Sequence, residues 1–185
     1  MNTTNSTNSI NDLVVDYAKN KGFHRQTLDR WLGLGESDRQ ALLKLTDELK
    51  LGENHFRDFL EWLEEISLRD RQGFGEILTR SEFSDALTDP RLGRSDQLKR
   101  VKEALRRLRF PRLAKIEEEV QKKIRELKLK SQVVLSVPPG LEGGTLSIQL
   151  TASSHGELKE LVEQVEQVVE RDEMREIFSL LKGEG

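Results

Sequence analysis

Basic side chains crowd one stretch of the chain and could bind phosphate groups. Residues 90–112 hold nine basic residues against two acidic ones, Asp96 and Glu103. Seven of the nine are arginines, whose planar guanidinium group forms paired hydrogen bonds with phosphate or carboxylate oxygens. We expect nucleic-acid contacts from seven residues of this stretch: Lys99, Arg100, Lys102, Arg106, Arg107, Arg109 and Arg112.

A helix is predicted to carry most of these side chains. Ser95 is expected to begin it, and it runs to about Arg109 with one apolar face: Leu98, Val101, Leu105 and Leu108. So many fixed positive charges repel one another unless phosphates or carboxylates offset them. Two interpretations therefore stay open: nucleic-acid binding, or pairing with the acidic segment around Glu61–Glu65, within the chain or on another molecule. No aromatic residue interleaves the basic positions, which counts against stacking on single strands.

A second basic group lies near the N-terminus. Asp16–Arg39 could form a helix-turn-helix, with two short helices separated by Gly22. Arg25 and Arg30 fall on the second of these helices, and arginine contacts base edges and phosphates. Helix pairs separated by glycine are also common in all-helical domains, so both interpretations stay open. We count Arg25 and Arg30 among the predicted nucleic-acid-binding residues.

Residues suited to catalysis or metal binding are scarce. The chain has no cysteine, which excludes a thiolate metal site and a cysteine nucleophile. His24, His55 and His155 lie in three different segments, without the spacing of metal ligands. The glycine-rich stretch of residues 138–144 has no Lys-Ser/Thr and joins two predicted strands, so it is not typical of a phosphate loop. We expect a protein that is not an enzyme and uses no metal or cofactor.

Composition favours a helical protein outside the membrane. Of 185 residues, 35% are hydrophobic and 34% charged, with a net charge of −3. Leucine recurs throughout, so a core can form from narrow apolar stripes. Apolar runs are too short to span a bilayer, and residues 1–9 lack the pattern of a secretory signal. We therefore expect a soluble, cytoplasmic protein without membrane contact.

The first part of the chain is expected to be a polar disordered tail, residues 1–9, followed by a helical domain, residues 10–110. Ser37, in a capping box with Gln40, is expected to begin one helix, and Asn54 the next. Apolar periodicity predicts seven helices in all, the fourth of which carries the clearest stripe: Phe56, Phe59, Leu60, Leu63 and Ile66.

Residues 111–185 are expected to form a small α-β-β-α unit. Pro111 suits the first position of a helix, and Ser154 with Glu157 forms a capping box that begins another. Between them, the alternation of side chains predicts strands over residues 132–137 and 145–150. The predicted fold class is therefore α+β, mainly α, with an N-terminal helical bundle followed by this unit.

The C-terminal unit is also expected to mediate homodimerisation. A two-stranded sheet is marginally stable alone. The helix after the second strand is expected to point six apolar residues inward, a stripe wider than one hairpin face needs: Leu158, Leu161, Val162, Val165, Val168 and Val169. Surplus apolar surface of this kind is typical of an interface, and edge strands of two copies could complete the sheet. The alternative is that the helical domain covers the surplus within one chain.

Several segments resemble ParB-like partition proteins in the region that follows their helix-turn-helix. The similar segments are residues 42–51 and 53–66, Arg107–Leu113, and Val137–Glu142. The resemblance would cover residues 37–182 and implies a DNA-associated helical module with a C-terminal association unit, acting in chromosome or plasmid partition. ParB-like proteins also carry an Arg-rich phosphate motif in an N-terminal nucleotide-handling domain. No such motif precedes the helices here, so nucleotide hydrolysis is not implied.

The sequence thus predicts a non-enzymatic module that contacts the phosphates of double-stranded DNA through a basic helix and forms a homodimer. The alternative is a protein–protein adaptor, whose basic helix docks on the acidic surface of a partner.

Overall fold

The computed structural model describes residues 9–183, and the chain divides into two compact units, Met1–Arg109 and Phe110–Gly185. The predicted disordered tail lies almost wholly outside the described residues. The structure is 73% helical with one small antiparallel sheet, which confirms the predicted α+β, mainly α class. Within residues 9–183, no helix is both long enough and apolar enough to cross a membrane.

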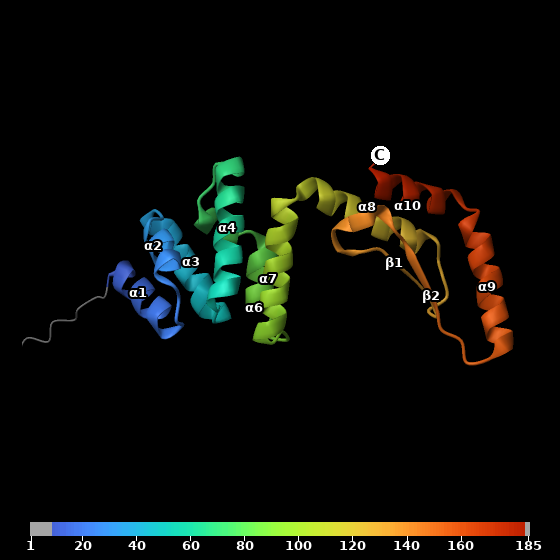
Figure 1. Cartoon of the computed structure of the whole chain (residues 1–185), viewed down its shortest axis with the longest axis horizontal. Coiled ribbons are helices and arrows are strands. Elements are labelled where there is room, and N and C mark those ends of the chain that lie inside the picture. Colours follow the sequence, from blue (N-terminus) through green and yellow to red (C-terminus); the bar gives the residue numbers. More distant parts are fainter. Residues whose placement is uncertain (1–8, 184–185) are drawn as a thin grey trace, which may run out of the picture. The chain divides into compact units, whose positions relative to one another are not determined.

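In residues 9–109, the described part of the N-terminal unit, every regular element is a helix (Figure 1). They are α1 (Ile10–Asn20), α2 (Arg25–Leu32), α3 (Glu36–Leu49), α4 (Glu53–Asp70), α5 (Phe74–Leu78), α6 (Ser81–Thr88) and α7 (Arg94–Arg109). The apolar stripe of α4 lies at the centre of the core, where Phe56, Phe59, Leu60 and Leu63 have no exposed surface. Trp31 from α2 packs on Phe56 with 4.4 Å between ring centroids. The core therefore fixes α2 and α4 against each other.

The C-terminal unit combines helices with a β-hairpin. Its elements are α8 (Pro111–Glu126), β1 (Val133–Ser136), a 3-10 segment (Pro139–Gly144), β2 (Ser147–Leu150), α9 (His155–Val169) and α10 (Asp172–Lys182). The strands pair antiparallel, with Val133 opposite Leu150 and Leu135 opposite Ile148. Its core joins α8, α9 and α10 through six buried residues: Val120, Leu127, Val168, Met174, Ile177 and Leu181.

Two of the predicted helix starts are right and three are wrong. Pro111 is the first residue of α8, and the Ser154 side chain accepts a hydrogen bond from the backbone of Glu157 at 3.1 Å. In contrast, α3, α4 and α7 begin one or two residues before their expected starts, the first two after glycines. Gly35 and Gly52 adopt extended backbone, and each carbonyl accepts the first helical hydrogen bond. Glycine has no side chain to accept a hydrogen bond from the first turn, so neither helix has the side-chain cap that the sequence predicted at Ser37 or Asn54.

The apolar stripe of α9 also differs from the prediction. Leu161 and Val168 are buried, whereas Leu158, Val162 and Val169 are 42%, 40% and 47% exposed. The expectation that all six stripe residues point inward is therefore wrong for these three. One face of α9 contacts its own unit, Val165 is partly buried, and the other three apolar side chains are exposed to solvent.

Candidate nucleic-acid interface

Helix α7 holds the basic side chains against a rigid support. Val101 and Leu105 are fully buried, and Leu98 and Leu108 pack on the same core. The basic residues occupy the other sides of the helix, so their backbone positions are fixed by the packing of the apolar face. A cation on this helix therefore either finds a partner within the unit or remains in solvent.

The side of α7 that faces α4 pairs its cations with carboxylates. The ammonium group of Lys102 lies 2.9 Å from the carboxylate of Asp58. The guanidinium of Arg109 donates to Glu65 at 2.5 and 2.8 Å and lies 3.5 Å from Glu61. The sequence analysis named the acidic segment of α4 as a possible internal partner. Carboxylates of α4 thus pair with Lys102 and Arg109, two of the residues predicted to contact phosphates.

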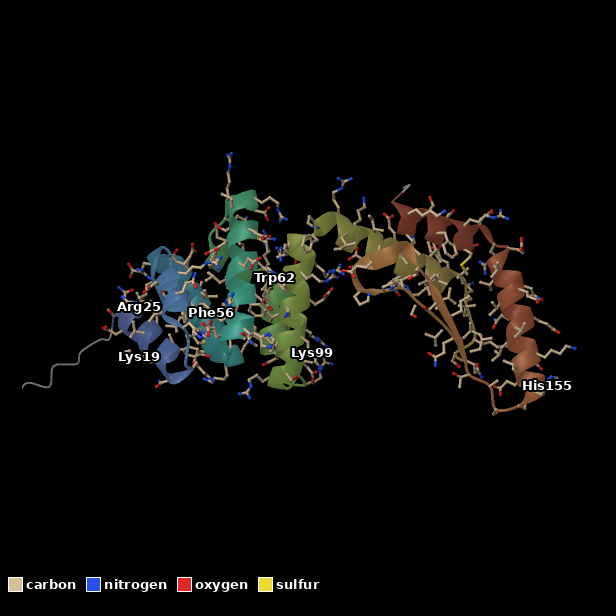
Figure 2. All side chains as sticks on the ribbon, viewed as in Figure 1. Lys19, Arg25, Phe56, Trp62, Lys99 and His155 are labelled. Carbon is tan, nitrogen blue, oxygen red and sulfur yellow. The ribbon has the colours of Figure 1, made fainter. Side chains whose placement is uncertain are left out.

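An aromatic ring strengthens this pairing. Trp62, marked in Figure 2, is a residue of α4 whose ring lies 5.5 Å from the Lys102 ammonium and 5.7 Å from the Arg109 guanidinium. A cation near the face of an indole ring gains about 0.5–1 kcal/mol at exposed sites and more when it is desolvated. The Arg109 side chain is only 22% exposed. Lys102 and Arg109 are therefore held by α4, and a phosphate must compete for them.

Two further predicted residues lie on the C-terminal half of α7. Arg106 donates two hydrogen bonds of 2.8 Å to Glu103, one helical turn earlier. The same contact with Arg106 lowers the pKa of Glu103. Arg107 is partly buried and takes part in interactions of its own. Neither residue is presented to solvent as fully as the basic residues that begin the helix.

The basic residues at the beginning of α7 are exposed to solvent and form at most long, weak ion pairs within the described part of the protein. Lys99, marked in Figure 2, is 76% exposed and lies 3.6 Å from Asp96. Arg100 is 58% exposed and lies 3.9 Å from Asp89. Arg94 is exposed and forms no ion pair with any residue of the range 9–183. Exposed pairs at such distances contribute little energy, so these side chains are available to an external anion.

Arg91 stands beside these residues but is better paired. It donates to Asp89 at 2.9 Å, and its hydrogen bonds lower the pKa of Asp89 to about 2. We call Arg91, Arg94, Lys99 and Arg100 the α7 basic patch. Arg91 and Arg94 were counted in the basic stretch of the sequence but not among its site residues. Their position in the same basic stretch, residues 90–112, is the signal by which they could have been included among the predicted site residues.

Arg112 belongs to the other unit. It is exposed on the first turn of α8 and lines an open hollow of about 520 Å³ between α8 and α10, together with Lys115, Ile116 and Leu180. Glu119 also lines this hollow and reduces its positive charge. Arg112 is therefore part of a mixed surface and not of the α7 basic patch.

The predicted helix-turn-helix corresponds to α1 and α2, which are in contact. Arg25, marked in Figure 2, is 93% exposed, with Asp29 at 3.6 Å one turn along α2. Arg30 pairs with Glu64 of α4 and keeps 45% of its side chain exposed. Of these two predicted contacts, Arg25 is presented to solvent and Arg30 is held by the acidic helix.

The N-terminus of α2 is closed by a carboxylate of the protein itself. Glu53, at the first position of α4, accepts hydrogen bonds from the His24 backbone at 2.9 Å and from the Thr27 hydroxyl at 2.5 Å. Its second oxygen lies 2.6 Å from Nδ1 of His24. The hydrogen bond from Thr27 contributes most to lowering the pKa of Glu53, to about 2. An anion binding at this helix end would have to displace Glu53.

The Glu53 contact predicts a pH dependence of stability. Because the pKa is lower in the folded protein than its ordinary 4.5, the stabilisation is complete above pH 4.5 and is lost as the pH falls towards 2. We expect Glu53→Gln to lower the melting temperature by a few degrees at pH 6, and the difference from wild type to shrink near pH 3. Thermal unfolding followed by tryptophan fluorescence measures both, and an equal difference at the two pH values would contradict the assignment.

Catalytic or metal-binding groups do not converge in the part of the chain that is described. No three His, Asp or Glu side chains of residues 9–183 lie close enough to hold a metal ion. The Tyr17 hydroxyl donates to the carbonyls of Thr46 and Leu51 at 3.0 Å, and burial raises its pKa to about 12. Tyr17 is therefore a structural donor and not an acid or base near neutral pH.

Comparison with protein-family models, with curated proteins and with solved structures finds no match for this chain.

Proposed function

We propose that the chain binds the phosphates of double-stranded DNA through the α7 basic patch and is not an enzyme. The observation that carries this proposal is the exposure of Arg94, Lys99 and Arg100, with long or absent ion pairs, at the start of a helix fixed by its apolar face. Positioned cations of this kind replace counterions along the DNA backbone. Because such contacts are to phosphate, the binding is expected to be largely independent of DNA sequence.

The proposal of DNA binding is also supported by the cations of α7 that form no close ion pair with α4. The acidic helix accepts Lys102 and Arg109 on one side of α7, and no carboxylate of residues 9–183 lies that close to Lys99 or Arg100. The resemblance to ParB-like proteins adds a process, chromosome or plasmid partition, and agrees with the expected cytoplasmic location. On this basis we propose a partition-like DNA-associated module.

The proposal predicts a loss of DNA affinity in a triple variant. Changing Arg94, Lys99 and Arg100 to Gln should weaken binding to random duplex DNA by about tenfold or more at low salt, because three cations no longer reach phosphates. The slope of log affinity against log salt should also become shallower by about 0.9 for each phosphate that is no longer neutralised. Fluorescence anisotropy with labelled duplex at several salt concentrations measures both quantities.

A matched control makes the same change in net charge elsewhere. Lys19, Lys44 and Arg71 are exposed residues of the same unit outside the patch. Their change to Gln should leave the salt slope unaltered. If both triple variants bind DNA like the wild type, the patch does not bind DNA.

The adaptor interpretation keeps one specific observation in its favour. Carboxylates of α4 already bind α7, so an acidic protein surface could bind its exposed end by the same chemistry. Absence of duplex binding at 50 mM salt, together with an undisturbed fold, would favour this function over DNA binding.

We also propose that the chain forms a homodimer through its C-terminal unit. Exposed apolar side chains occur on both the hairpin and α9, with Val134 50% and Ile148 38% exposed in addition to those of α9. A symmetric dimer would carry two α7 basic patches, and binding through two linked sites increases avidity.

A further inference from the structure

Helix α9 carries a continuous apolar row that its own unit leaves in solvent. Leu158, Val162, Val165 and Val169 recur at intervals of four, three and four residues, so they lie along one side of the helix. Leu158, Val162 and Val169 are each at least 40% exposed, and Val165 is partly buried. We call these four residues the α9 outer row. The buried residues Leu161 and Val168 lie on the adjacent side and attach α9 to its unit.

We infer that the α9 outer row packs antiparallel against the outer row of α9 from a second copy of this chain. The inference rests on the proposed homodimer and names its interface. Spacing by three and four residues is the pattern of helices that pack side by side at a shallow angle. An apolar row bordered by charged residues is typical of such an interface.

The order of side chains in the row favours the antiparallel direction. The midpoint of the row lies between Val162 and Val165. When two copies run antiparallel about this point, Leu158 faces the partner's Val169, and Val162 faces the partner's Val165. The larger Leu158 then meets a smaller side chain at each end, and the two halves of the interface are identical, as a two-fold axis requires.

Charge complementarity favours the same direction. Lys159 is the one basic residue in the sequence of α9, and it lies on the same flank of the outer row as Glu166. Neither side chain forms an ion pair with another described residue. In an antiparallel pair, equivalent flanks face each other, and Lys159 comes beside the partner's Glu166 at both ends. In a parallel pair the equivalent flanks lie on opposite sides of the interface, so Lys159 would not come beside the partner's Glu166.

The position of α9 in its unit allows this contact. Figure 1 shows α9 as the long helix that follows β2 and precedes α10. Lys130 lies 3.4 Å from Glu160, an ion pair that connects α9 to the segment before β1 and does not involve the outer row. His155, marked in Figure 2, begins the helix. The outer row and its flank therefore remain available while α9 stays attached to its own unit.

The test is the oligomeric state of the full chain, measured by sedimentation over a range of protein concentrations. We expect a wild-type dimer, and a monomer for Val162→Asp, which places a charge in the outer row. Val134→Asp, on β1 and outside the row, is the matched control and should remain a dimer. Circular dichroism checks that each variant is folded.

A charge exchange tests the direction of the pair without changing its apolar contacts. Lys159→Glu and Glu166→Lys should each weaken the dimer by about tenfold, because each creates two like-charge contacts. The double variant Lys159→Glu with Glu166→Lys restores both attractions and should recover most of the wild-type affinity. A double variant as weak as the two singles would overturn the antiparallel arrangement.

The outcomes separate this inference from the proposals on which it rests. A wild-type chain that is monomeric at high micromolar concentration overturns both the homodimer and the α9 pair. A dimer that resists Val162→Asp but is lost with Val134→Asp overturns the α9 pair and leaves a dimer through the hairpin. DNA affinity is measured independently, because none of these substitutions changes the α7 basic patch.

Discussion

Replacing Phe56 with alanine is expected to lower the free energy of unfolding of the N-terminal unit by about 3–5 kcal/mol. The Phe56 side chain has no exposed surface, and its ring centroid lies 4.4 Å from that of Trp31 and 5.0 Å from that of Phe23. Its removal leaves a cavity among side chains of α2, α4 and the turn before α2. The surrounding rings can fill such a space only in part, which is why the expected loss is large.

Urea unfolding followed by tryptophan fluorescence measures this loss. Both tryptophans of the chain, Trp31 and Trp62, belong to the N-terminal unit, so the signal reports on that unit. Leu68→Ala is the matched control, since Leu68 lies on the same helix and is 84% exposed. Its expected change is within about 0.5 kcal/mol. Equal effects of the two substitutions would show that Phe56 does not support the core as described.

The loss of Phe56 also bears on the proposed function. Helix α7 packs on the same core through Val101 and Leu105, and that packing fixes the backbone from which Lys99 and Arg100 project. A destabilised core should therefore reduce DNA affinity at temperatures where the unit begins to unfold. At lower temperature the α7 basic patch is intact and the affinity should equal that of the wild type.

Local signals explain how much of the fold the sequence could predict. The apolar stripe of α4, Pro111 at the start of α8 and Ser154 at the start of α9 each act within a few residues, and all three are where the sequence placed them. Ser37 and Asn54 also have the right residue types for a cap. In the structure each of them is the second residue of its helix, and the N-cap position is taken by a glycine that has no capping side chain.

Contacts between distant residues explain what the sequence could not predict. Asp38, placed in the first turn of α3, accepts a hydrogen bond from the backbone of Phe74 at 2.8 Å and so caps α5. Glu53 likewise caps α2 from the start of α4. The sequence shows the charge of such residues, but a choice among many possible partners depends on the packed structure.

In the candidate site, too, local features could be predicted from the sequence, whereas contacts between distant residues could not. Residue types alone identified α7 as a basic helix with an apolar face. They did not show that Lys102 and Arg109 lie on the side that faces α4, because the partners Asp58 and Glu65 are 44 residues away in the chain. Similarly, the stripe of α9 was visible in the sequence, whereas the side that packs on its own unit depends on the positions of α8 and α10.

Replacing Ile177 with alanine is expected to lower the free energy of unfolding of the C-terminal unit by about 2–5 kcal/mol. Ile177 lies on α10, has no exposed surface and belongs to the cluster of six buried residues that joins α8, α9 and α10. Small domains have total stabilities of about 5–15 kcal/mol, so this loss is a large fraction of what holds the unit together. The neighbouring Phe178 is 40% exposed, and Phe178→Ala is the matched control with a smaller expected effect.

The measurement exploits the absence of tryptophan from residues 110–185. Far-ultraviolet circular dichroism should show the Ile177→Ala chain losing helix at lower urea concentration, while the tryptophan transition of the N-terminal unit stays in place. Since the proposed dimerisation would stabilise the folded unit by mass action, its transition should also move to higher urea as the protein concentration rises. Val162→Asp should abolish that concentration dependence, because it removes the α9 pair. A tryptophan transition that shifts together with the circular dichroism in Ile177→Ala would contradict independent cores in the two units.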